Sequence, residues 1–382
     1  MAVALSPEPG LPPPLPSKPA VAALTGEPIK IGAIFSVTGT GAPLGTPEKE
    51  TAELVQKMVN GAGGINGRPL EIIVADDQSD ENQALAAAKR LIESDKVVAV
   101  VGPTISPTSL AIISTFETAK VPLVSCAASV KITQPVRSWV FSTAQPDTLA
   151  VSRLLEYLKT KQIDKVAVLY DSNAFGKSGM DVLEKQAPES KVQIVAKESF
   201  GSKDTTMSAQ LTKVKAAKPQ AVICWGTNPG PAVVAKEMKQ MKFDVPLYMS
   251  HGIANRKFIE LAGDAANGVV FPAGKLLIAE ALPATDPRKQ VLLDYGKAFQ
   301  EAYQGKSADT FGGHAWDALQ IVVKALKEAG PDPAKLRNAI ESTKDFAGVS
   351  GVFSLSATDH NGLTKDSFVM VTIKGGNWVQ AE

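Results

Sequence analysis

The stretch "VVAVVGPTISPTSLAIISTFETAKVPLVSCAAS", residues 97–129, decides the fold class of this chain. Two apolar runs, each followed by small hydroxylated residues, flank a segment with helical spacing from 106 to 119. Strands that are apolar throughout are typical of a parallel sheet covered by helices on both faces. The pattern therefore predicts a β-α-β unit in which Ser106, Ser125 and Ser129 follow the carboxyl ends of two strands.

The same alternation of strand and helix extends along the chain in both directions. Before this stretch, "IKIGAIFS" and "LEIIVADD" read as strands, and after residue 147 the alternation starts again. We expect helices at 47–61, 81–94, 106–119, 148–161, 176–187, 205–217, 230–241, 287–304, 310–329 and 333–343. A terminal hairpin-like pair of strands, "GVFSLS" at 351–356 and "SFVMVTIKGGNWV" at 367–379, is expected to follow. The sequence thus predicts an α/β protein with two doubly wound parallel-sheet lobes in series, completed by its last hundred residues.

Composition narrows the class of protein. The chain has 382 residues and a formal net charge of +1, which does not favour a polyanionic partner such as nucleic acid. Its apolar runs are shorter than the ~20 residues that span a bilayer. Cys126 and Cys224 lie in apolar runs without metal or redox spacing and are expected to be buried free thiols.

The N-terminus is rich in proline. Residues 6–19, "SPEPGLPPPLPSKP", favour neither helix nor strand, so we expect 1–27 to be disordered. A basic region and an apolar core do not precede the small residues "AVAA" at 20–23, so no complete signal peptide can be read. Either the chain is cytoplasmic, or Met1 is not its biological start.

Two lobes in series place the carboxyl ends of their strands on facing sides of a cleft, where open sheets bind ligands. Hydroxyls and free N–H groups at the start of helices there predict a site for an anionic group such as a carboxylate.

Several motifs carry a family resemblance. "IKIGAIFSVTGTGAPLG", "GGINGRPLEIIVADDQSD", "VVAVVGPTISP", "VPLVSCAAS", "VAVLYDSNAFGKSG" and "LYMSHGIANRKFIELAG" resemble the type I periplasmic solute-binding proteins of branched-chain amino acid transport. The resemblance covers residues 28–380. It implies two lobes joined by a three-crossover hinge: 28–146 plus 273–350 as lobe 1, and 147–272 plus 351–382 as lobe 2. It also implies a periplasmic monomer, without a cofactor, that delivers a small ligand to the permease of an ABC importer.

The resemblance also implies the site. The carboxylate-binding serine falls on Ser106, and the groups that hold the ligand's amino group fall on Ala127 and Ser129. Phe175 would close over the ligand from lobe 2, and Phe311 would form an apolar wall. The remaining expected site residues are Leu44, in the glycine-rich loop that follows the first strand, Ser125, Thr227 and His251.

Two positions depart from the family pattern, and the usual small disulfide is missing as well. Thr227 stands where relatives carry an aromatic residue, and His251 stands where they carry the acid that pairs with the ligand's ammonium group. Ser79 and Ile105 replace the usual small disulfide. A buried ammonium ion without a counter-charge is costly. The intact set of Ser106, Ala127 and Ser129 favours a branched-chain or other neutral amino acid, whereas His251 keeps an aromatic carboxylate such as hydroxybenzoate open.

Other functions fit the sequence less well. The three histidines do not lie in a pattern typical of nucleophilic catalysis, and no phosphate-binding loop or metal spacing is present, so we expect neither an enzyme nor a metal site. Asp76 and Asp77, at a strand end, are expected to hold a turn. A cytoplasmic amide or amino-acid sensor of the same fold remains the alternative, which the unreadable signal peptide supports.

Overall fold

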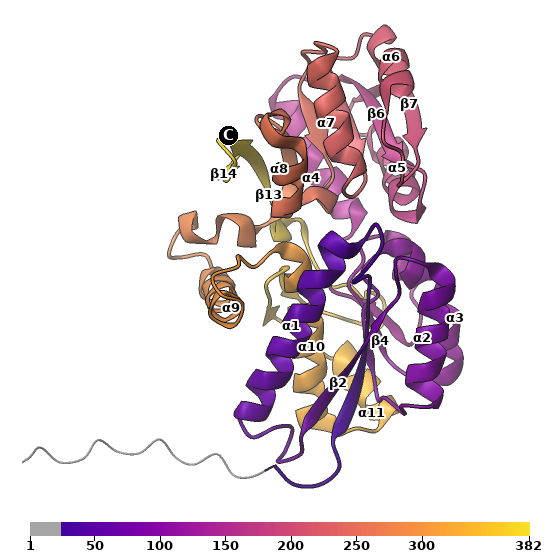
Figure 1. Cartoon of the computed structure of the whole chain (residues 1–382), viewed down its shortest axis with the longest axis vertical. Helices are drawn as coiled ribbons and strands as arrows, with labels where there is room; N and C mark the ends of the chain where they lie inside the picture. The colour runs from indigo at the N-terminus through magenta and orange to yellow at the C-terminus, as the bar shows by residue number, and fades with distance from the viewer. Residues whose placement is uncertain (1–23) are drawn as a thin grey trace, which may run out of the picture.

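The computed structural model describes residues 24–382 and places two lobes one above the other, each built around its own sheet (Figure 1). Most of the stretch expected to be disordered, residues 1–23, lies outside the described residues. Within the described part of the chain, no helix is both long and apolar enough to cross a membrane. The α/β class with two mainly parallel sheets is confirmed.

The first lobe contains a parallel sheet of order β2-β1-β3-β4-β5. Helices α2 and α3 pack together on one face, and α1 and α10 on the other (Figure 1). Cover on both faces explains why these strands are apolar throughout. The elements that begin this lobe are β1 (Ile29–Phe35), α1 (Ala42–Gly61), β2 (Leu70–Asp76), α2 (Glu81–Glu93), β3 (Val100–Val101), α3 (Ser106–Ala119), β4 (Leu123–Ser125) and β5 (Val140–Ser142).

The second lobe contains a sheet of order β14-β13-β10-β9-β8-β6-β7, in which β13 and β14 run antiparallel to their neighbours. All five residues of the inner strand β8 are buried. Its elements are α4 (Asp147–Thr160), β6 (Lys165–Asp171), α5 (Ala174–Gln186), β7 (Gln193–Phe200), α6 (Ser208–Ala216), β8 (Ala221–Trp225), α7 (Gly230–Gln240), β9 (Leu247–Met249), the 3-10 helix η2 (His251–Ile253), α8 (Arg256–Ala262), β10 (Val270–Gly274), β13 (Phe368–Lys374) and β14 (Asn377–Gln380).

The chain passes between the lobes three times. It leaves the first sheet after β5, returns after β10 to the face where α10 packs against α1, and leaves again after β12 to form β13 (Figure 1). The returning elements are α9 (Lys289–Ala302), α10 (Thr310–Ala329), α11 (Pro333–Glu341), β11 (Phe346–Ala347) and β12 (Val352–Phe353).

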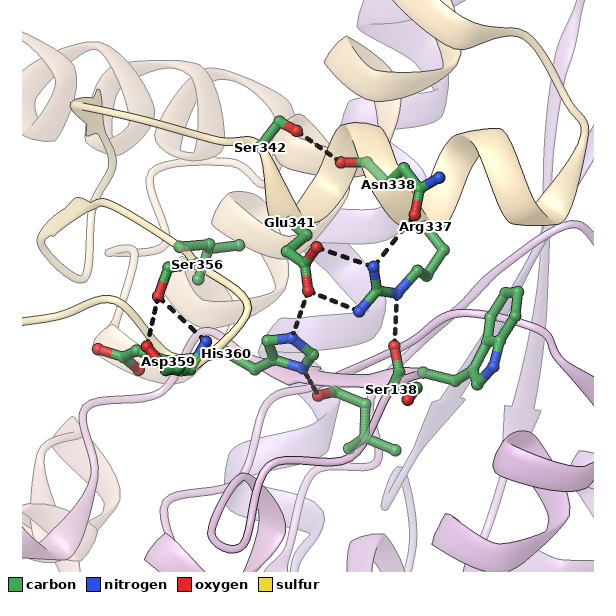
Figure 2. A network of polar contacts seen from close by, with 12 residues as sticks. Ser138, Arg337, Asn338, Glu341, Ser342, Ser356, Asp359 and His360 are labelled. Atoms are coloured by element: carbon green, nitrogen blue, oxygen red, sulfur yellow. Dashed lines mark hydrogen bonds and ion pairs between the residues drawn. The ribbon is translucent and has the colours of Figure 1, made fainter.

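A buried ionic network ties two of these crossings together (Figure 2). The His360 ring, fully buried, meets the Val140 carbonyl oxygen through Nδ1 at 2.9 Å and Glu341 Oε1 through Nε2 at 3.0 Å. Arg337 makes a bidentate pair with Glu341 and donates from Nε to the Ser138 carbonyl at 2.6 Å. The network holds the segment with Ser138 and Val140, which precedes the first crossing, against the segment with Arg337 and His360, which precedes the third crossing.

Most expected helices agree with the structure to within a few residues. The helices expected at 106–119 and 310–329 have those bounds. The first helix begins at Ala42 rather than at residue 47, and the one expected at 205 begins at Ser208. The short helix α8 and strand β10 were not expected from the pattern. The expected pairing of 351–356 with 367–379 is wrong: β12 pairs with β11, and β13 pairs with β14 and β10, because the chain changes lobe between β12 and β13.

Candidate ligand-binding site

A cavity lies between the two lobes, and the empty space in it, counted out to its open mouth, is about 600 Å³. Its wall on the first lobe comes from the loop after β1 and from the starts of α3 and α10. Its wall on the second lobe comes from the start of α5, the segment after β8 and η2. Seven of the nine expected site residues line the cavity: Leu44, Ser106, Ala127, Phe175, Thr227, His251 and Phe311. The other two, Ser125 and Ser129, lie behind that lining.

Ser106 is placed to donate to a ligand oxygen. It is the first residue of α3, after the N-cap Ile105, so it lies at the positive end of that helix. Its Oγ accepts a hydrogen bond from the Ser129 backbone N–H at 3.2 Å. Because this bond uses a lone pair, the Ser106 hydroxyl keeps its hydrogen for the cavity.

The hydroxyls of Ser125 and Ser129 are used within the protein. Ser125 Oγ is 2.8 Å from Ser109 Oγ and accepts from the Ala127 backbone N–H at 3.1 Å. Ser129 Oγ donates to Ser178 Oγ at 2.8 Å. These two serines therefore shape the segment that carries Ala127, and in this conformation neither hydroxyl faces the cavity.

The bond between Ser129 and Ser178 joins the two lobes. Ser178, on α5, is in turn hydrogen bonded to Asp147 Oδ2, and Asp147 Oδ1 accepts from the Val130 backbone N–H at 3.2 Å. Burial raises the pKa of Asp147 to about 6, although the bond from Ser178 opposes the shift. A chain of hydrogen bonds thus runs from Ser106 through the lobe interface to the first residue of α4.

An aromatic cluster surrounds His251, and two of its members, Phe175 and His251, line the cavity from the second lobe. The centroid of the His251 ring lies 5.5 Å from that of Phe175, 6.0 Å from Trp225 and 5.3 Å from Phe368, each edge to face. These rings meet because each lies at or next to the end of a strand at the cleft. Strand β8 ends at Trp225, β9 ends two residues before His251, and β13 begins at Phe368.

Two neutral imidazoles border the cavity from opposite lobes. Burial lowers the pKa of His251 to about 4, and neither ring nitrogen has a hydrogen-bond partner within the described chain. The Gln145 main chain faces the ring and opposes this shift without reaching hydrogen-bond geometry. Burial, and then the proximity of His251, lowers the pKa of His314 to about 3; its Nδ1 lies 2.8 Å from Ser350 Oγ. Both rings are uncharged at neutral pH.

The residues that line the cavity include no Asp, Glu, Lys or Arg. The second-lobe wall instead offers neutral groups without partners within the described chain, namely the His251 ring nitrogens and the buried Asn228 Oδ1. The site therefore combines hydrogen-bond donors at the start of α3 with neutral polar groups on the opposite wall. It is suited to a ligand with an anionic end and an uncharged polar end.

Thr104 and His314 also line the cavity and were not expected from the sequence. Thr104 lies two residues before Ser106, at the same strand end, so the rule that selected Ser106 could have included it. His314 lies one helical turn after Phe311 on α10, and helical periodicity places both on one face.

Asp76 and Asp77 hold a turn of the first lobe. The Asp76 carboxylate accepts hydrogen bonds from the Val37, Thr38 and Gln78 backbone N–H groups, at 2.8–3.1 Å. Although partial burial acts against it, a bond from the Thr38 hydroxyl at 2.6 Å and these backbone bonds lower the pKa of Asp76 below its usual value. Asp77 Oδ1 accepts from a serine hydroxyl at 2.7 Å. The expected structural role agrees with these contacts.

The cysteines are free and buried, as expected, and burial raises the pKa of both thiols. Within residues 24–382, no group of His, Cys, Asp and Glu side chains is arranged to hold a metal ion.

The fold and cavity agree with comparisons with known proteins. A family model described as "Periplasmic binding protein" matches residues 28–377, and the chain belongs to that family. It is a family of substrate-binding proteins rather than of enzymes. The resemblance to the type I solute-binding proteins of branched-chain amino acid transport is confirmed.

Individual members of this family are similar to the chain at 26–28% sequence identity. A leucine-, isoleucine-, valine-, threonine- and alanine-binding protein of Pseudomonas aeruginosa is 26% identical over 320 residues, which is 82% of each chain. An extracellular ligand-binding receptor from Rhodopseudomonas palustris superposes with a TM-score of 0.88 at 28% identity, over 93% of this chain and 100% of that one. The branched-chain amino acid transporter substrate-binding protein LivJ of Streptococcus pneumoniae, solved with isoleucine, gives 0.83 at 28% identity, over 93% and 99%.

Proposed function

We propose that this chain is the periplasmic substrate-binding component of an ABC importer and that it closes its two lobes over one small carboxylate. Family membership supports the transport role, and the cavity between the lobes supports a single binding site. Lobe 1, in this proposal, comprises 28–146 plus a returning segment that starts at 273 and runs through β12 and His360, because His360 bonds to Val140 of the first lobe. Lobe 2 comprises 147–272 plus the segment with β13 and β14. The protein acts as a monomer that delivers its ligand to the membrane permease.

The ligand class that the site supports best is a carboxylate without an ammonium group, such as a hydroxybenzoate. The observation that carries this proposal is the lining, which holds no acidic side chain and has the neutral His251 at the place of the expected acid. A desolvated ammonium ion without a counter-charge costs several kcal/mol. The Ser129 hydroxyl, expected to help hold an amino group, is bonded to Ser178 instead.

In the proposed pose, the carboxylate lies at the start of α3, where Ser106 can donate to it. The ring of the ligand packs between Phe175 and Phe311, which line the cavity from opposite lobes. A hydroxyl at the far end of the ligand meets the unpartnered nitrogens of His251 or the Asn228 amide oxygen.

A branched-chain amino acid is the second candidate. It is favoured by the similarity to the Pseudomonas aeruginosa and Streptococcus pneumoniae proteins, whose names describe binding of branched-chain amino acids. Ala127, whose carbonyl the family pattern assigns to the ligand amino group, does line the cavity. That carbonyl oxygen already accepts from Ser142 Oγ at 3.1 Å, which leaves one lone pair for a ligand.

Calorimetric titration with 4-hydroxybenzoate and with leucine separates the two candidates, with wild type, His251→Glu and the neutral control His251→Gln. We expect 4-hydroxybenzoate to bind wild type and to bind His251→Glu at least tenfold more weakly, because two anions then share a dry site. Leucine would bind His251→Glu more tightly than wild type, because its ammonium group gains a counter-charge. Binding of leucine but not of 4-hydroxybenzoate by wild type would contradict the proposed ligand class.

A further inference from the structure

A fully buried acid lies directly behind the cavity wall. Glu48, on α1, is 0% exposed, and its Oε2 is hydrogen bonded to Thr104 Oγ1. Its other carboxyl oxygen, Oε1, has no hydrogen-bond partner within the described chain. Thr104 itself lines the cavity, two residues before Ser106. Glu48 is thus one hydrogen bond away from whatever fills the site.

The surroundings of Glu48 favour its neutral form. The titratable groups that face it are Asp77, from the end of β2, Asp309, the N-cap of α10, and the Cys126 thiol after β4. No Lys, Arg or His forms an ion pair with it among residues 24–382. Burial, with the two aspartates adding to it, raises the pKa of Glu48 well above its usual value, against the bond from Thr104. A neutral acid also leaves Oε1 as an unpaired carbonyl rather than an unpaired anionic oxygen, which costs far less.

The protonation of Glu48 decides what Thr104 offers to the cavity. Thr104 Oγ1 already accepts a hydrogen bond from the Ser36 backbone N–H at 2.9 Å. If Glu48 were ionised, the single hydrogen of the Thr104 hydroxyl would have to point at it, and the cavity would meet only a lone pair. When Glu48 is neutral, its own O–H donates to Thr104, and the Thr104 hydrogen is free to turn toward the ligand.

We propose that Glu48 is a positioning residue: as a neutral acid it donates to Thr104 and thereby makes the Thr104 hydroxyl a hydrogen-bond donor to a ligand oxygen. The proposal rests on the proposed function, because it assigns the ligand's carboxylate to two donor hydroxyls, Thr104 and Ser106, on either side of Ile105. The two donor hydroxyls favour a hydrogen-bond acceptor at this end of the cavity and disfavour an ammonium group or an amide N–H.

The protonation state is tested first, on the protein without ligand. Infrared spectra in D₂O at pH 8 are compared between wild type and Glu48→Gln. This pH lies above the pKa of about 7 to which burial raises Asp309 and Asp317. We expect wild type to show a carboxylic-acid C=O band that Glu48→Gln lacks. If the two spectra do not differ in this band, Glu48 is ionised and the proposal is wrong.

The positioning role is tested by binding, with 4-hydroxybenzoate as the probe and leucine as a second probe. Thr104→Val is expected to weaken binding about tenfold, whereas Thr104→Ser retains it. Glu48→Gln keeps a donor toward Thr104 and is expected to bind within about twofold of wild type. Glu48→Leu, which has no donor, is expected to weaken binding about fivefold in wild type and not at all in Thr104→Val.

The double-mutant comparison separates positioning from a general structural role. If Glu48→Leu weakens binding by the same factor with Thr104 and with Val at position 104, the acid acts through the fold, and the proposal is overturned. If neither probe binds wild type, the proposed ligand classes fail, and the infrared band by itself decides for or against a neutral Glu48.

Discussion

The neutral His251 ring makes stability depend on pH in a way that one substitution isolates. Its pKa is about 4 in the folded protein, against 6.5 for an unperturbed histidine. Because the folded pKa is the lower one, the unfolded chain binds the proton more readily, and stability is lost as the pH falls from about 6.5 toward 4. At pH 5 this linkage removes about 2 kcal/mol of the free energy of unfolding, and at pH 7 almost nothing.

His251→Leu removes the titratable imidazole, which has no hydrogen-bond partner, from a cluster of aromatic side chains. The free energy of unfolding of the variant minus that of wild type is therefore expected to grow by about 2 kcal/mol between pH 7 and pH 5. Urea unfolding at pH 7, 6 and 5 measures this difference. His314 and the buried aspartates titrate in both proteins, so their contributions largely cancel.

Phe368→Leu is the matched control, because it replaces an aromatic ring of the same cluster by a smaller side chain without removing a titratable group. Its difference from wild type should stay constant over this pH range. A His251→Leu difference that also stays constant would refute the conclusion that the His251 ring is neutral and unpartnered in the folded protein.

Three further outcomes are expected. Ser106→Ala should weaken binding of 4-hydroxybenzoate at least tenfold, with little change in melting temperature; unchanged affinity in calorimetry would remove Ser106 from the site. His360→Ala should lower the free energy of unfolding by about 3 kcal/mol, because it leaves the buried partners of His360 without their hydrogen bonds. Lys197→Ala, at an exposed ion pair, should leave the free energy of unfolding almost unchanged. Ser178→Ala removes the hydrogen bond to Ser129 between the lobes and should weaken binding of 4-hydroxybenzoate about fivefold. The variant should also show less ligand-induced compaction than wild type, as measured by small-angle scattering. Equal compaction of variant and wild type would show that this bond does not favour closure of the lobes.

Local signals in the sequence were sufficient for the framework of the fold. The helix at 106–119 could be predicted to the residue because Pro107 favours a first turn and helical spacing continues to the last turn. The two-residue length of β3 could not be predicted, because the apolar run already begins at Val97 and only the neighbouring strands decide where pairing starts. Strand β10 was missed because its partner β13 lies about a hundred residues further along the chain.

For the candidate site too, some features follow from the sequence and others only from the tertiary structure. The sequence by itself determined which segments reach the cleft, because strand ends and helix starts are local features, and Ser106, Phe175 and His251 all lie on them. Only the tertiary structure decided what each polar group does there. The Ser129 hydroxyl is used by Ser178 of the other lobe, and the charge of Glu48 depends on the aspartates and apolar groups that packing gathers around it. Hydrogen-bond direction and protonation depend on distance and burial, and these are set by contacts between residues that lie far apart in the sequence.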